Sequence, residues 1–118
     1  MNYREEVKRT ANADKDAVIE RFSKSPFLLN AASGLAGESG EFCDLVKKHV
    51  FHGATLDRDK VIKELGDIRW YLEQAAYLMD VSMEEIERLN VEKLRKRYPE
   101  GFNTQASIER KDVNGEEA

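Results

Sequence analysis

The sequence has little of what marks a secreted or membrane protein. Cys43 is its only cysteine, so no disulfide can form within the chain, and this fits a reducing compartment. No apolar run approaches the length of a membrane-spanning helix, and no hydrophobic signal segment opens the chain. We therefore expect a soluble, cytoplasmic protein without a membrane partner.

An excess of charge of one sign is also missing. Charged residues make up 36% of the 118 residues, yet the net charge is only −4, so both signs are mixed along the chain. Domains that bind nucleic acids are normally basic, so the composition argues against a nucleic-acid partner. A chain of this length forms one domain by the usual size prior, and domains this small often gain stability by forming oligomers.

Proline is scarce, and long strand-like alternation is absent, so the sequence predicts an all-α fold. Helices are expected over residues 3–22 (one or two, broken near 12–14), 26–52, 59–79 and 83–98. We expect a single domain over residues 1–110. From Phe102 the chain is expected to be extended and to end in a flexible tail over residues 111–118.

Local signals and apolar stripes support the long helices. Pro26 suits a first turn, Gly53 suits a left-handed C-terminal cap, and Ser82 with Glu85 forms a capping box. At helical spacing, two stripes predict the core. They comprise Leu28, Ala32, Leu35, Phe42 and Val46 in the first long helix, and Val61, Leu65, Ile68, Leu72, Ala75 and Met79 in the second.

Two short acidic motifs are the most informative feature that is present. Residues 37–41 supply Glu38 and Glu41, and residues 64–67 supply Glu64 and Asp67. The i,i+3 spacing places each pair on one face of its helix, and both pairs fall on the same flank of two antiparallel neighbours. Four converging carboxylates suit Mg²⁺ or Mn²⁺. The pattern predicts a metal-dependent enzyme that acts on phosphates.

The alternative is that each acid pair only decorates a solvated helix face, as is common in a chain this charged. Three glycines around the first pair weigh against that alternative, because glycine destabilises a helix interior by roughly 1 kcal/mol relative to alanine. Their presence suggests close approach by another helix or by a ligand. These glycines are Gly34, Gly37 and Gly40.

The last long helix carries polar residues where core residues are expected. Asn90 and Arg97 fall on its apolar stripe, with Lys93 beside them. Either Asn90 caps neighbouring backbone and Arg97 snorkels, or the three side chains reach the phosphates of a metal-bound ligand. Lys48 lies toward the acidic flank of its own helix, although a solvated lysine is the simpler interpretation.

For four further residues, the sequence favours a structural role or no specific role over catalysis or metal binding. His49 and His52 lack the third ligand that a zinc site needs. Cys43 is expected to pack between helices, since no histidine is placed to activate it. Trp70 lies opposite the apolar stripe of its helix, which favours an oligomer interface over a surface for base stacking.

Three separated blocks resemble the MazG-like branch of the all-α nucleoside triphosphate pyrophosphohydrolases, many of whose short, single-domain forms come from phages and bacteria. The blocks are residues 35–42 (LAGESGEF), 63–72 (KELGDIRWYL) and 90–102 (NVEKLRKRYPEGF). The family pattern is EExxE followed by ExxD. Gly37 stands where the first acid belongs, so four acids remain and the number of metal ions stays open.

The resemblance implies Mg²⁺-dependent hydrolysis of (deoxy)nucleoside triphosphates to the monophosphate and pyrophosphate, in house-cleaning or control of the nucleotide pool. The metal-binding acids of the family match Glu38, Glu41, Glu64 and Asp67. A water bound to Mg²⁺ (or Mn²⁺), or positioned by a carboxylate such as Glu38 or Glu41, attacks phosphorus, and which acid is the base stays open.

The resemblance also implies roles in substrate binding. Asn90 and Lys93 match the family's N-x-x-K block and would contact sugar or phosphate. Arg97, Tyr98 and Arg110 are secondary candidates for binding anions or for docking the tail. The base and sugar preference of the substrate is not predicted.

Finally, about three substantial helices can form only a small core relative to the number of apolar residues in the sequence. Tyr77 and Leu78 lie on other faces, which a second copy would cover by completing a larger bundle. The resemblance points the same way, to a homodimer or a homotetramer of two dimers. The competing hypothesis is a non-catalytic interaction or regulatory protein that keeps the family fold, but retention of four acids favours the enzyme.

Overall fold

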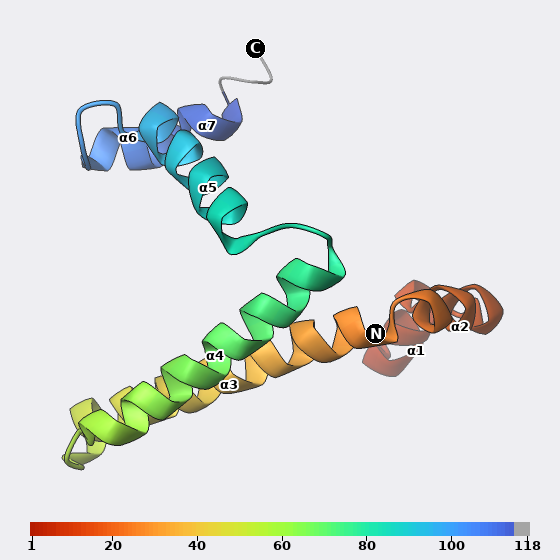
Figure 1. Cartoon of the computed structure of the whole chain (residues 1–118). Helices are drawn as coiled ribbons and strands as arrows, with labels where there is room; N and C mark the ends of the chain where they lie inside the picture. The colour runs from red at the N-terminus through yellow and green to blue at the C-terminus, as the bar shows by residue number, and fades with distance from the viewer. Residues whose placement is uncertain (115–118) are drawn as a thin grey trace. The chain divides into compact units, whose positions relative to one another are not determined.

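The regular elements found in residues 1–114, the part described by the computed structural model, are helices, as predicted (Figure 1). They are α1 (Tyr3–Thr10), α2 (Lys15–Lys24), α3 (Pro26–His52), α4 (Arg58–Leu78), α5 (Met83–Arg97), α6 (Thr104–Glu109) and α7 (Lys111–Asn114). The chain divides into an N-terminal unit, Met1–Ala75, and a C-terminal unit that begins at Ala76. The predicted single domain over residues 1–110 stays a prediction. Within the described residues, no helix combines the length and apolar character needed to cross a bilayer.

The long helices begin and end at the predicted local signals. Pro26 lies in the first turn of α3, and Gly53 ends that helix with φ +71°, a left-handed conformation that glycine adopts without steric cost. The Ser82 hydroxyl accepts a hydrogen bond from the Glu85 backbone N–H at 3.1 Å, which caps α5. The predicted break near residues 12–14 separates α1 from α2, where the Asp14 side chain accepts from the Ala17 N–H at 3.1 Å.

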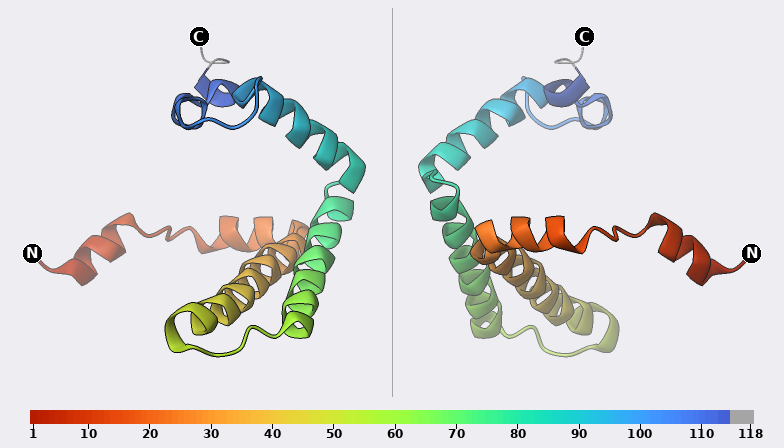
Figure 2. Two further views of the ribbon diagram at one scale, coloured as in Figure 1. Left: turned by 90° about the vertical axis from the view of Figure 1, so that its left-hand side faces the viewer. Right: turned by 90° about the vertical axis from the view of Figure 1, so that its right-hand side faces the viewer.

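The N-terminal unit is built around the antiparallel pair α3 and α4, joined by a short loop (Figures 1 and 2). The two helices approach closely at Gly34, where an added methyl group would overlap the ring of Tyr71. One turn earlier on α3, the Asn30 side-chain amide donates to Gln74 at 3.4 Å. Of the three glycines in this stretch, only Gly34 makes the predicted close approach. A methyl group at Gly37 or Gly40 would meet nothing within 4 Å.

The predicted apolar stripes are confirmed in part. Their half-buried members are Leu28, Leu35, Phe42 and Val46 of α3 and Val61, Ile68 and Ala75 of α4. Ala31, not Ala32, is the buried alanine of α3. On and just after α4, Leu65 is 47% exposed, Leu72 37% and Met79 62%. The contact also includes Gly34 and Tyr71, and Tyr71 lies roughly a quarter turn from the centre of the α4 stripe. Gly34 leaves room for the bulky Tyr71 ring between the helices, and the exposed Leu65 and Leu72 lie on the side of the stripe away from Tyr71.

The C-terminal unit contains a long-range ion pair. Arg97, at the end of α5, donates from Nε to Asp112 Oδ1 at 2.6 Å and from a terminal nitrogen to Oδ2 at 2.8 Å. The Asp112 side chain is 1% exposed, so this bidentate pair ties α7 to α5 away from water. The Arg97 guanidinium holds the pKa of the Asp112 carboxyl below its usual range.

The prediction of an extended chain from Phe102 is therefore wrong for the residues that form α6 and α7. Asn103 caps α6 by accepting a hydrogen bond from the Ala106 N–H at 2.7 Å, and Arg110 turns the chain between the two helices with φ +49°. Of the tail predicted over residues 111–118, residues 111–114 are helical and residues 115–118 lie outside the described part. The local sequence does not reveal helices this short, because their stability depends on docking to α5.

Candidate functional site

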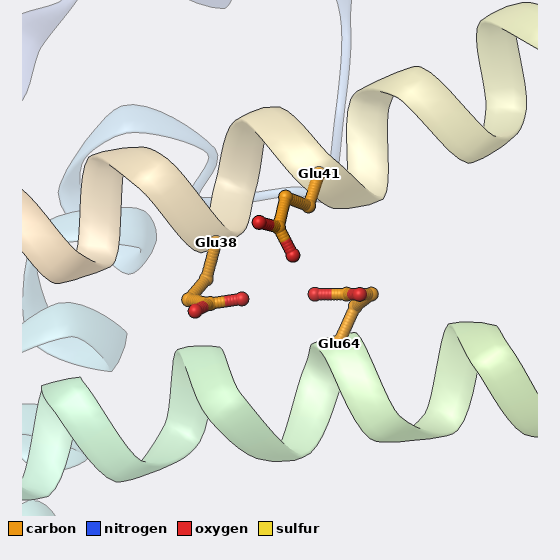
Figure 3. A group of neighbouring side chains, drawn as sticks. All are labelled: Glu38, Glu41 and Glu64. Carbon is orange, nitrogen blue, oxygen red and sulfur yellow. The ribbon is translucent and has the colours of Figure 1, made fainter.

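Three glutamates from the two helices of the N-terminal unit point toward one another (Figure 3). Glu38 and Glu41 project from α3 and Glu64 projects from α4. One carboxylate oxygen from each residue lies within 4.8 Å of the other two. Glu38 and Glu64 are half-buried between the helices, and Glu41 is exposed. We call this set the glutamate trio.

The electrostatics of the glutamate trio are unfavourable without a counterion. Glu38 Oε2 and Glu64 Oε2 are buried and have no hydrogen-bond partner. Burial raises the pKa of Glu64 to about 7, and the neighbouring carboxyl groups of Glu38 and Glu41 add to the rise. A buried carboxylate that lacks a partner is costly, so the site favours either a proton or a cation.

The donor set fits a hard divalent cation. All three side chains offer carboxylate oxygens, which Mg²⁺ and Mn²⁺ prefer. Figure 3 shows the three carboxyl groups directed toward one another between α3 and α4, and two of their oxygens are buried without a partner. The trio therefore has the ligand chemistry and the unsatisfied charge of a metal site.

Asp67, the fourth predicted acid, lies outside the trio but next to it. It lines a hollow of about 330 Å³ together with Glu38, Trp70 and Tyr71. The Trp70 and Tyr71 rings meet edge to face, with centroids 5.0 Å apart and planes at 85°. Trp70 is 59% exposed, as its position opposite the apolar stripe predicts. The sequence analysis did not single out Tyr71, although its i,i+4 spacing from Asp67 was a usable signal.

The basic candidate Lys48 has a partner of its own. Lys48 Nζ lies 2.7 Å from Asp44 Oδ2 on the same face of α3, and Lys47 lies 3.9 Å from the other oxygen. The hydrogen bond from Lys48 lowers the pKa of Asp44. Lys48 therefore participates in a solvated ion pair, the simpler of its two interpretations.

The remaining substrate-binding candidates belong to the C-terminal unit. Asn90 is exposed, so it does not occupy a buried stripe. Lys93 lines a small hollow together with Asp112. Arg97 is paired with Asp112, which matches the alternative that it docks the tail, and its guanidinium also lies 5.9 Å from the centre of the Tyr98 ring. Asp112 was not predicted as the partner of Arg97, because nothing in the local sequence pattern marks it.

The structure also places His49 and Cys43, which the sequence left without a clear functional role. His49 Nδ1 lies 2.8 Å from the Ala54 carbonyl oxygen, and in the tautomer that donates there it ties the loop after α3 to that helix. Cys43 is exposed, so the prediction that it packs between helices is wrong within this chain.

Comparison with known proteins identifies a family. The profile described as the MazG nucleotide pyrophosphohydrolase domain matches residues 28–102. The Gene 37 protein of Mycobacterium phage L5 is 36% identical over 72 residues, which cover 58% of this chain and 63% of that protein. The match thus spans less than two thirds of that relative's length. No solved structure matches the chain.

Proposed function

Because the chain belongs to the MazG nucleotide pyrophosphohydrolase family, we propose that it hydrolyses (deoxy)nucleoside triphosphates to the monophosphate and pyrophosphate. The reaction would serve house-cleaning or control of the nucleotide pool in the cytoplasm. The observation that carries the proposal is the glutamate trio, in which one carboxylate oxygen from each side chain lies within 4.8 Å of the others. Such a cluster would hold the cation that a polyphosphate substrate needs.

The glutamate trio, with Asp67 beside it, would bind Mg²⁺ or Mn²⁺. The bound ion would neutralise negative charge on the phosphate oxygens. Glu38 and Glu64 would present their buried Oε2 atoms to the ion, and Glu64 would give up its proton when the ion binds. Glu38 or Glu41 would orient the attacking water and accept its proton, because both carboxylates face the same space.

For substrate binding we propose Asn90 and Lys93, on the N-x-x-K pattern alone. Tyr98 stays a secondary candidate. Arg97 and Lys48 already have carboxylate partners in Asp112 and Asp44, which would have to be displaced before either could bind a phosphate. This competition makes Lys93 the stronger candidate of the basic residues.

We further propose that the protein works as a homodimer or as a tetramer of two dimers. Among the described residues, the buried apolar side chains are only those of Ala31 and Ala76, and no large side chain is fully buried. Covering the remaining surface of a leucine that is already half covered is worth about 1 kcal/mol, so Leu65 and Leu72 favour association. Light scattering at low micromolar concentration tests this, and a monomer mass for a fully active protein would contradict it.

The activity is tested by assaying a panel of ribo- and deoxyribonucleoside triphosphates with Mg²⁺. Release of pyrophosphate and monophosphate is expected, whereas orthophosphate as the product would refute cleavage between the α and β phosphates. Glu38→Gln and Asp67→Asn are each expected to abolish hydrolysis while leaving the helical circular dichroism unchanged. Glu73→Gln is the matched control, since Glu73 is an exposed acid of α4 that pairs with Arg69. Near-normal activity of Glu38→Gln would remove the proposed site.

A further inference from the structure

Trp70 combines two properties that a purely structural tryptophan would not need. Its side chain is 59% exposed on α4, although tryptophan is the largest side chain in the sequence. It also lines the hollow that Glu38 and Asp67 line. An aromatic face and the carboxylates of the candidate metal site therefore open onto one space.

The indole is also held in place from one side. Tyr71 meets it edge to face at 5.0 Å, and Tyr71 is itself seated against Gly34, where no side chain larger than hydrogen fits. An edge-to-face contact covers at most one face of the indole, so at least one face stays open. The indole is thus packed against Tyr71 on one side and has the hollow beside it on another.

An interface between copies would account for the exposure of Trp70 but not for its place in the hollow beside two acids. The exposed apolar residues Leu65 and Leu72 lie roughly 140–160° around the α4 axis from Trp70, at 100° per residue. A partner that covers only those leucines would not reach Trp70, whereas one that covers Tyr77, 66% exposed and about 20° from Trp70 around α4, would reach it. The neighbours of Trp70 in the hollow include two acids, which a desolvated protein interface disfavours.

We infer that Trp70 is the platform on which the nucleobase of the substrate stacks, with the phosphates directed to the neighbouring acids. The inference rests on the proposed function and adds the part of the substrate that the acids cannot hold. The hollow of about 330 Å³ lies within the usual range for small-ligand sites. Because stacking uses the face of a base, which every base has, this mode of binding tolerates different bases.

The first test uses the fluorescence of the wild-type protein, because Trp70 is the only tryptophan. Excitation at the red edge of indole absorption reports on this residue alone. With Mg²⁺ present, α,β-methylene ATP is expected to quench the emission, whereas inorganic tripolyphosphate, which has no base, is expected to leave it nearly unchanged. Calorimetric binding of the analogue without quenching would overturn the inference and leave the proposed function intact.

The second test separates binding from chemistry. Trp70→Ala is expected to raise KM for ATP at least about fivefold with kcat nearly unchanged, and Trp70→Phe is expected to restore most of the loss. Tyr77→Ala is the matched control, since Tyr77 is an aromatic 66% exposed on the same helix but does not line the hollow. A Trp70→Ala protein with unchanged KM but a smaller mass in light scattering would assign Trp70 to an interface instead. Absence of both hydrolysis and analogue binding in the wild type would overturn the proposed function together with the stacking role.

Discussion

Gly34→Ala tests whether the contact between α3 and α4 sets the geometry of the candidate site. The added methyl group would overlap the Tyr71 ring, so either the ring or the helix must move. Gly34 lies one turn before Glu38, and Tyr71 lies one turn after Asp67. A shift at this contact would therefore change the spacing between the carboxylates of the two helices.

The expected magnitude follows from two opposing effects. Replacing a glycine in a helix interior by alanine stabilises the helix by about 1 kcal/mol. Forcing a methyl group into a packed contact costs about 1–3 kcal/mol. Gly34→Ala should thus change the free energy of unfolding by between about zero and 2 kcal/mol of destabilisation. Gly37→Ala, on the same helix but with nothing within 4 Å of its new methyl group, should stabilise by about 1 kcal/mol.

Urea unfolding followed by circular dichroism, at one protein concentration throughout, measures these differences. The decisive comparison is a double-mutant cycle with Tyr71→Ala, which removes the ring. In that background Gly34→Ala should become stabilising by about 1 kcal/mol, like Gly37→Ala. If Gly34→Ala stabilises the otherwise wild-type protein as much as Gly37→Ala does, the Gly34–Tyr71 contact does not hold the helices together. The stabilisation by Mg²⁺ should fall in Gly34→Ala and stay unchanged in Gly37→Ala.

Three other predictions concern the charged groups. Glu64→Gln should abolish the rise in melting temperature that Mg²⁺ produces in the wild type, and an equal rise in both proteins would exclude Glu64 as a ligand. In EDTA, the folded protein keeps the Glu64 proton up to about pH 7 while the unfolded chain loses it near pH 4.5, so the stability of the wild type should fall as the pH rises through that window. Glu64→Gln should lack this fall. A wild-type stability that rises with pH between about 4.5 and 7 would contradict a raised pKa of Glu64. Asp112→Asn should increase hydrogen exchange in α6 and α7 relative to Glu84→Gln, an exposed acid of α5, and equal protection in the two variants would show that the pair with Arg97 does not hold α7.

The parts of the fold that could be predicted from the sequence are those set by neighbouring residues. Pro26, Gly53 and the Ser82 cap act within one or two turns, so the ends of α3 and the start of α5 follow from the local sequence. The helices α6 and α7 do not, because Asp112 finds its partner fifteen positions away at Arg97. A bond that closes over such a distance leaves no periodic signal.

The candidate site was predictable to a similar extent. The i,i+3 spacing indicates that Glu38 and Glu41 share a face, and the structure brings Glu64 to them across the helix pair. What spacing does not reveal is the rotation of α4 about its own axis, which depends on the Tyr71 ring entering at Gly34. Nor does spacing show that Asp67 lies outside the trio, in the adjoining hollow.

The Arg97–Asp112 pair also changes where this protein can be shortened. Similarity to the family profile ends at residue 102, but the counterion of Arg97 comes ten residues later. A chain cut at 102 would lose both the carboxylate that pairs with Arg97 and the helices α6 and α7 that pack on α5. The region that matches the family profile is therefore shorter than the segment that packs together. A protein truncated at that boundary is expected to have a frayed α5.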